Sequence, residues 1–162
     1  MKHSALAILF VFVMGIVRSQ SFSGTITPDV TIPTFTDLTI GSTATGTVSF
    51  ASTTDYLNGV TVLNFNSFQV RCNKSWVFTI QATTANFTGG TSTIPASVVG
   101  VRLNGGSAFL PLSTTGQTLK SGTLGDAAAA GHTFSIDVNA NPGFNYNGGT
   151  YTIALQYTLT SQ

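Results

Sequence analysis

The side chains that usually carry catalysis are scarce in this sequence. After residue 19 the chain has one histidine, His132, one cysteine, Cys72, and no glutamate. A catalytic triad needs a nucleophile, a base and a residue that orients the base, and a zinc site needs three or four ligands. One histidine without glutamate supplies neither set, so we expect a protein that is not an enzyme and that holds no metal or cofactor.

Calcium binding is the nearest approach to metal chemistry. Asp137, Asn139 and Asn141 place side-chain oxygens at alternating positions, as the opening of a Ca²⁺ loop does. An EF-hand loop then needs Gly at its sixth position and a bidentate Glu at its twelfth, where this chain has Pro142 and Gly148. We expect the three side chains to form the solvent face of a strand that runs into a turn, with calcium as the minor alternative.

Aromatic residues flanked by amides form the other candidate site. Phe144 and Tyr146 alternate with Asn145 and Asn147, and Tyr56 precedes a second turn. A ring beside amide donors suits the apolar face and the hydroxyls of a sugar. Aromatic rings near strand ends also fill protein cores, so these three residues are either a ligand surface or core plugs.

The chain begins like an exported protein. Lys2 is followed by the apolar run Ala5–Val17 and by small or branched residues up to Ser19, which is typical of a secretory signal peptide. The run of 13 residues is shorter than the roughly 20 that a membrane-spanning helix needs. We expect cleavage before Gln20, a secreted or cell-surface protein without a membrane span, and a single domain over residues 20–162.

The mature chain is nearly neutral. Four cations and five aspartates remain after residue 19. Nucleic acid and anionic membranes require several cations in one patch, so we expect neither partner.

The lone Cys72 cannot form an internal disulfide, and we expect it to be buried as a small apolar side chain, with an intermolecular disulfide as the alternative.

Alternation of apolar and polar residues with a period of two runs through most of the mature chain, and Gly- and Asn-rich turns interrupt it. This pattern predicts an all-β fold, a single antiparallel β-sandwich of about eight short strands. We also expect at most one helical turn, at Asp126–Gly131. The predicted strands are Thr43–Phe50, Gly59–Phe65, Phe68–Cys72, Trp76–Ala82, Val98–Leu103, Thr118–Gly122, Phe134–Ala140 and Tyr151–Thr160.

The segment after the cleavage site, residues 20–32, has the pattern of a strand. Phe22, Ile26, Val30 and Ile32 share one parity, and two prolines accompany them. Proline is confined to sheet edges because it cannot donate to a ladder. The segment is therefore either an ordinary first edge strand or a strand that completes the sheet of a neighbouring subunit.

Two stretches, Ser75–Ile80 and Gly149–Thr160, resemble exported bacterial surface domains. The first, led by Trp76, and the second, which starts its strand at Tyr151, are similar to the paired motifs of WxL cell-surface domains. The same ending, together with Arg71-Cys72-Asn73, resembles spore-coat-U proteins and chaperone–usher pilin subunits. The resemblance implies an immunoglobulin-like fold and, in the pilin case, assembly by donor-strand exchange.

These observations lead to one expected function and one alternative. The expected function is a secreted bacterial structural or adhesive cell-surface protein, pilin-like or part of an extracellular matrix, which associates with itself or with other surface proteins through β-strands. The alternative is a non-catalytic module that binds carbohydrate or cell wall. Two glycosylation sequons begin at Asn73 and Asn86.

Overall fold

The computed structural model of the protein describes residues 27–42 and 46–162 and divides into two units, Met1–Ile32 and Pro33–Gln162. The predicted signal peptide and the positions Phe22 and Ile26 lie outside the described residues. Within the first unit, residues 27–32 contain neither helix nor strand. The structure below is that of the second unit.

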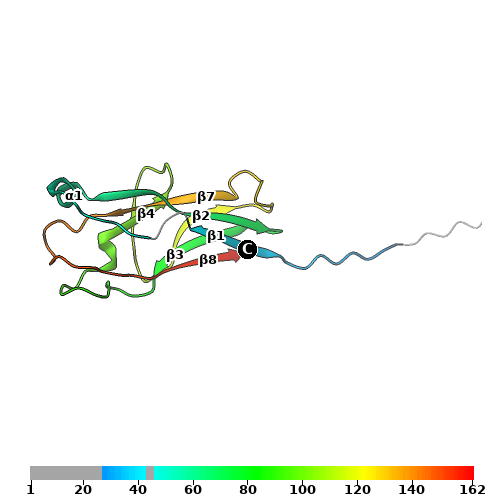
Figure 1. Ribbon diagram of the computed structural model, residues 1–162. Coiled ribbons are helices and arrows are strands. Elements are labelled where there is room, and N and C mark those ends of the chain that lie inside the picture. Colours follow the sequence, from blue (N-terminus) through cyan, green and yellow to red (C-terminus); the bar gives the residue numbers. More distant parts are fainter. Residues whose placement is uncertain (1–26, 43–45) are drawn as a thin grey trace, which may run out of the picture. The chain divides into compact units, whose positions relative to one another are not determined.

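The second unit is an antiparallel β-sandwich of two sheets (Figure 1). The larger sheet has five strands in the order β1-β2-β7-β4-β5 and the smaller has three in the order β6-β3-β8. The larger sheet comprises β1 (Thr36–Ser42), β2 (Val60–Cys72), β7 (Thr133–Ala140), β4 (Val99–Leu103) and β5 (Leu110–Pro111). The smaller sheet comprises β6 (Gln117–Gly122), β3 (Trp76–Ala82) and β8 (Leu155–Ser161). The predicted fold class is confirmed.

Local details differ from the predicted elements. The predicted strand Thr43–Phe50 is wrong, because the described residues 46–50 pair in no ladder and the first strand is β1, just upstream. The two predicted strands between Gly59 and Cys72 form one strand, β2, which a bulge bends between Val62 and Asn66. A bulge bends its strand and increases the local twist.

The predicted helical turn at Asp126–Gly131 is also wrong. These residues form turns, in which the Asp126 carboxylate accepts the backbone N–H groups of Ala128 and Ala129. The α-helix of the described chain is instead α1 (Thr53–Asn58), and a single 3-10 turn, η1, covers Ala96–Val98. None of the helices in the described ranges is long and apolar enough to cross a membrane.

The core lies between the sheets and follows the alternation of the strands. Every second residue of β3, from Trp76 to Ala82, is buried. Phe68 of β2 is fully buried and contacts rings from both sheets, at centroid distances of 4.7 Å to Phe78, 5.4 Å to Phe134 and 4.9 Å to Tyr157. Cys72 is 3% exposed, which confirms the expected buried thiol.

Replacing Trp76 by Ala should destabilise the domain strongly. Trp76 is 1% exposed and packs edge-on against His132 and parallel to Phe134. Truncation leaves a cavity and removes transfer energy, so we expect a loss of about 3–5 kcal/mol in the free energy of unfolding. Urea denaturation measures it, with Leu124→Ala as the matched control, because Leu124 is 67% exposed. A loss below about 1 kcal/mol would contradict the central place of Trp76 in the core.

Candidate functional site

The candidate aromatic residues meet at one end of the sandwich, where α1 lies near the loop 141–152 (Figure 1). Tyr56 of α1 and Phe144 of the loop stack with their ring centroids 5.1 Å apart and their planes 19° apart. Phe50 contacts the ring of Tyr56 at 5.3 Å. Stacking turns one face of Tyr56 and one face of Phe144 toward each other, so only the remaining ring surfaces are open to a ligand.

A capping box fixes α1 and hence Tyr56. The Ser52 hydroxyl accepts the Asp55 N–H at 3.3 Å, and the Asp55 carboxylate accepts the backbone N–H groups of Ala51 and Ser52 at 2.8 and 2.9 Å. These hydrogen bonds, the one from Ala51 first, lower the pKa of Asp55. The helix has no buried residue, so its cap rather than its packing determines where it begins.

The third aromatic residue, Tyr146, lines an open cavity of about 630 Å³ between the sheets at this same end. Tyr56 also lines the cavity, whereas Phe144 lies outside it and is 65% exposed. The structure therefore brings the three predicted residues to one place but gives them two roles. Phe144 is a surface ring, while Tyr56 and Tyr146 form part of a cavity wall.

Hydrogen bonds hold the loop beside this cavity. The Tyr151 hydroxyl donates to the carbonyl of Asn147 at 2.9 Å and accepts the N–H of Ser92 at 3.2 Å. The Asn147 N–H in turn donates to the Ser92 hydroxyl at 2.9 Å, and its side-chain amide to Thr91 at 3.2 Å. Burial raises the pKa of Tyr151, but its hydrogen bonds with Ser92 and Thr91 outweigh this and lower it. Two loops distant in sequence are thus tied together.

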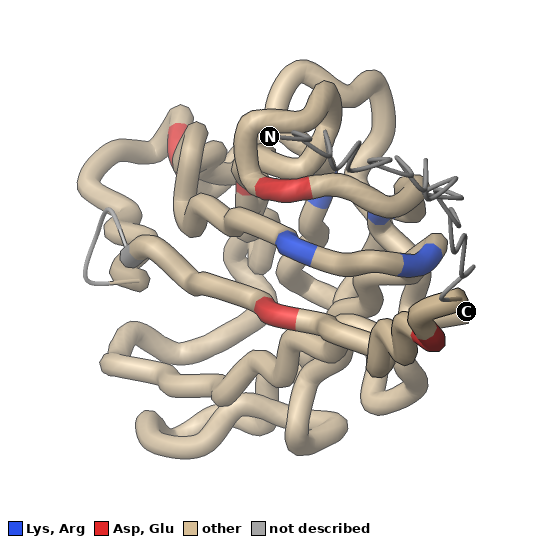
Figure 2. Tube along the Cα trace, turned by 90° about the vertical axis from the view of Figure 1, so that its right-hand side faces the viewer, with Lys and Arg blue, Asp and Glu red and all other residues tan. Residues whose placement is uncertain are grey.

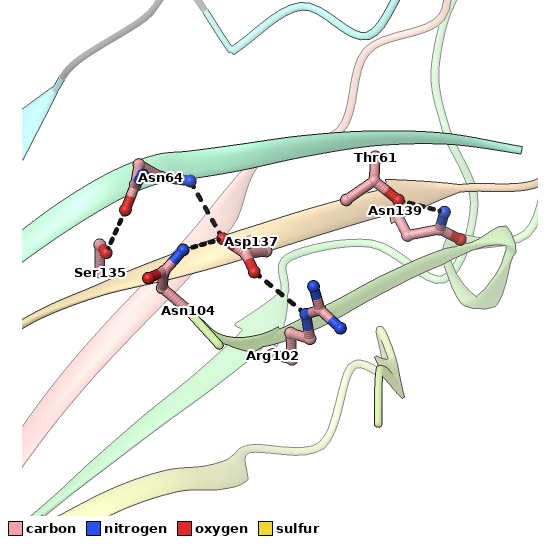
Figure 3. Close-up of polar contacts among 7 residues, drawn as sticks. All are labelled: Thr61, Asn64, Arg102, Asn104, Ser135, Asp137 and Asn139. Atoms are coloured by element: carbon pink, nitrogen blue, oxygen red, sulfur yellow. Dashed lines mark hydrogen bonds and ion pairs between the residues drawn. The ribbon is translucent and has the colours of Figure 1, made fainter. Parts of the chain in front are cut away.

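The minor alternative, calcium binding, named Asp137, Asn139 and Asn141, and the first two of these side chains bond to different partners. Asp137 is completely buried on the outer side of β7, and its carboxylate accepts the Nδ2–H of Asn104 at 2.8 Å, the backbone N–H of Asn64 at 3.0 Å and the Nε–H of Arg102 at 3.0 Å (Figure 3). Asn139 donates its amide to Thr61 at 2.9 Å. With three N–H donors on its oxygens, Asp137 is occupied as an acceptor and offers no ready position to a cation.

Among the described residues, Asp137 is a fully buried carboxylate that the alternating pattern did not predict to be buried. Burial raises its pKa, but the hydrogen bonds from Asn104, Asn64 and Arg102 together lower it below its ordinary value. Asn64 reaches the carboxylate because it sits at the bulge of β2 with φ of 52°, a left-handed conformation that asparagine tolerates. The network joins β2, β4 and β7 on the face opposite the core.

His132 and Cys72 take structural positions. His132 is 2% exposed and its Nδ1 lies 3.0 Å from the carbonyl oxygen of Val70. The Cys72 sulfur lies 3.4 Å from the hydroxyl of Thr36. Within residues 27–42 and 46–162, no cluster of three or more His, Cys, Asp or Glu side chains is placed to hold a metal ion.

The charged residues are few and widely spaced over the domain (Figure 2). Arg71 pairs with Asp37 at 2.9 Å, and their side chains are 43% and 40% exposed. Arg102 pairs with the buried Asp137. Lys120 lies over the ring of Phe134 at 5.4 Å. Most of the cations are therefore engaged by neighbours within the domain.

The predicted subunit-contact residues can be placed only in part. Val30 and Ile32 are 79% and 77% exposed.

The sequence of this chain matches no known protein family, and none of the curated proteins is significantly similar to it.

Replacing Asp137 by Asn should destabilise the domain by about 3 kcal/mol, because it leaves Arg102 facing an uncharged group in a buried site. The pKa of Asp137 is lowered in the folded state, so the stability it contributes is present above about pH 4 and is lost as the pH falls through the folded pKa. We expect Asp137→Asn to remove that part of the acid dependence. Urea denaturation at pH 7 and at pH 3 measures both effects.

The matched control is Asp37→Asn, which breaks the exposed pair with Arg71. An exposed ion pair contributes less than about 1 kcal/mol. Equal losses in the two variants, or an unchanged acid dependence in Asp137→Asn, would show that the buried network does not stabilise the fold.

Proposed function

We propose that this chain is a secreted structural or adhesive protein of the bacterial cell surface, which associates through β-strand contacts at the seam between β1 and β8. The observation that carries the proposal is the exposure of Ile40. Its cross-strand partner on β2, Phe68, is completely buried on the inner face of the larger sheet, yet Ile40 on the same face is 49% exposed. Side chains opposite each other in a ladder share a face, so the smaller sheet does not fully cover β1.

The other side of the seam is an unpaired strand edge. β8 is the last strand of the smaller sheet and pairs only with β3 among the described residues. The Ala154 carbonyl accepts the N–H of Thr83, and the Gln162 N–H donates to the Ser75 carbonyl. Since hydrogen-bonded pairs alternate along an antiparallel ladder, the N–H and C=O groups of Leu155, Tyr157 and Leu159 point away from β3.

The side chains of β8 are consistent with a missing neighbour. Leu155, Tyr157 and Leu159 face the core but are only partly buried. The Tyr157 hydroxyl accepts a hydrogen bond at 2.7 Å from the amide of Asn66, which spans the two sheets, and burial raises the pKa of Tyr157. An added strand would satisfy the free edge groups and cover these apolar side chains.

A lysine at the seam should block association without unfolding the domain. We expect Ile40→Lys to weaken self-association about tenfold or more, because a strand that docks over the seam would have to bury the ammonium group. Analytical ultracentrifugation of the mature chain, residues 20–162, measures the association. The control is Leu124→Lys, at a site of similar size and greater exposure, which should associate as the wild type does.

Deleting residues 20–32 identifies the strand that fills the seam. If this segment of a second copy docks there, the shortened chain stays folded and monomeric, and a synthetic peptide of residues 20–32 binds to it. Monomeric behaviour of the wild-type mature chain over the micromolar range, or unchanged assembly of Ile40→Lys, would overturn the proposal.

The alternative function, binding of carbohydrate or cell wall, is favoured by one specific observation. Phe144 holds an exposed ring at a loop tip beside two asparagines, and the apolar faces of sugars stack on such rings. We expect Phe144→Ala to abolish retention on purified cell wall if the ring is a platform, at a stability loss below about 1 kcal/mol. Phe144→Trp should restore retention, and a loss of several kcal/mol would identify the ring as a core plug.

A further inference from the structure

The cavity at the α1 end of the sandwich is larger than packing defects in protein interiors. It measures about 630 Å³, whereas cores leave few voids larger than a water molecule. Ligand pockets typically span about 300–1,000 Å³. Because this cavity is open to solvent and falls within that range, it has the dimensions of a ligand site rather than of a packing fault in the core.

Both sheets contribute to the floor of the cavity, and they contribute apolar side chains. Val99 and Val138 come from neighbouring strands of the larger sheet, and Leu155 comes from β8 of the smaller. Leu112, from the segment after β5, is 2% exposed and lines the same space. The part of a ligand that reaches the floor must therefore be apolar, because nothing there accepts or donates a hydrogen bond from a side chain.

The mouth of the cavity is aromatic and polar but uncharged. We define the mouth as lining residues that are half-buried or exposed, and these include Tyr56, Tyr146 and Asn147 together with Gly148 and Gly149. Among the described residues that line the cavity, none is Asp, Glu, Lys, Arg or His. A charged ligand would lose its hydration without gaining a partner here, which selects for a neutral molecule.

The wall at the mouth is formed before any ligand arrives. The Ser92 N–H donates to the Tyr151 hydroxyl, and the Asn147 N–H donates to the Ser92 hydroxyl, so this loop is bonded to the loop that contains Ser92. The Tyr151 ring lies against Gly90 so closely that a Cβ on that glycine would clash with it. A wall that is already ordered spares a ligand the entropic cost of ordering it. The cavity is thus pre-organised on the side where a ligand enters.

From this geometry we infer that the cavity is a binding site for a neutral small molecule with a mainly apolar body and an uncharged polar end at Tyr146 and Asn147. The cavity meets the β1–β8 seam at Leu155, but its centre lies elsewhere, because neither Ile40 nor Tyr157 lines it. Its occupation and the association of the chain can therefore be measured independently.

Two fluorescent probes with the same ring system test the inference on the mature chain. N-phenyl-1-naphthylamine is neutral, and 8-anilino-1-naphthalenesulfonate is its sulfonated counterpart. We expect saturable binding of the neutral probe at one site per chain, and binding of the sulfonate at least about tenfold weaker because no cation faces it. Equal affinity for the two probes, or no saturable binding of the neutral probe, would overturn the inference.

A plug at the mouth locates the site. A Cβ at Gly148 meets nothing within 4 Å, so Gly148→Trp should fold as the wild type does while its indole obstructs the cavity. We expect it to lose neutral-probe affinity about tenfold or more, whereas Leu124→Trp, at an exposed position outside the lining, should keep it. Undiminished binding by a folded Gly148→Trp would place the probe elsewhere and contradict the proposal.

A second variant serves if Gly148→Trp fails to fold. Val48 is half-buried and lines the cavity, so Val48→Lys adds a cation to the wall. We expect this variant to gain affinity for the sulfonate relative to the neutral probe. An unchanged ratio of the two affinities in the folded Val48→Lys variant would show that the probes do not bind in the cavity.

Discussion

The two sheets hold together through the packing of Phe68 against rings on the opposite sheet. Phe68 lies on β2, in the larger sheet, and contacts Phe78 on β3 and Tyr157 on β8, both in the smaller sheet. Each such aromatic pair contributes about 0.5–1.5 kcal/mol beyond the area it buries. Because the lone Cys72 leaves the fold without an internal disulfide, this contact between the sheets is what the rest of the sandwich depends on.

The two openings of the domain follow from where this packing stops. Three strands cannot cover five, so inner-face side chains toward β1 stay partly exposed, as Ile40 does. At the α1 end, side chains of both sheets and of the loops beside them line the cavity. The outer face of the larger sheet is stabilised differently, by the charged network around Asp137, which fixes the bulge of β2 (Figure 3).

The sequence was sufficient for the fold class and for the strands that bury one face. β3, β7 and much of β8 appear where alternation predicts them, because a half-buried strand must alternate. The same rule failed at residues 46–50, where Val48 and Phe50 alternate but contact the core from outside any ladder. The helix α1 had a local signal, the Ser52–Asp55 capping box, which the strand pattern around it obscured.

The candidate site was predictable in its members but not in its form. Tyr56, Phe144 and Tyr146 were recognisable as aromatic residues beside amides, yet only the folded loops show that two of them line a cavity and one is exposed. The burial of Asp137 depends on Asn64 of β2, Arg102 of β4 and Asn104 just after β4. Contacts at such sequence separations leave no local pattern, which is why the alternation placed Asp137 in solvent.

β8 is an edge strand of the smaller sheet, and hydrogen exchange of its backbone amides directly tests the proposal that another strand pairs with this edge. In the monomer, the amides of Gln156, Thr158 and Thr160 are bonded to β3 and should already be protected. We predict that the amides of Leu155, Tyr157 and Leu159 exchange rapidly in the monomer and become protected on association. Rapid exchange of these three amides in the associated form would contradict the pairing of another strand with the edge of β8.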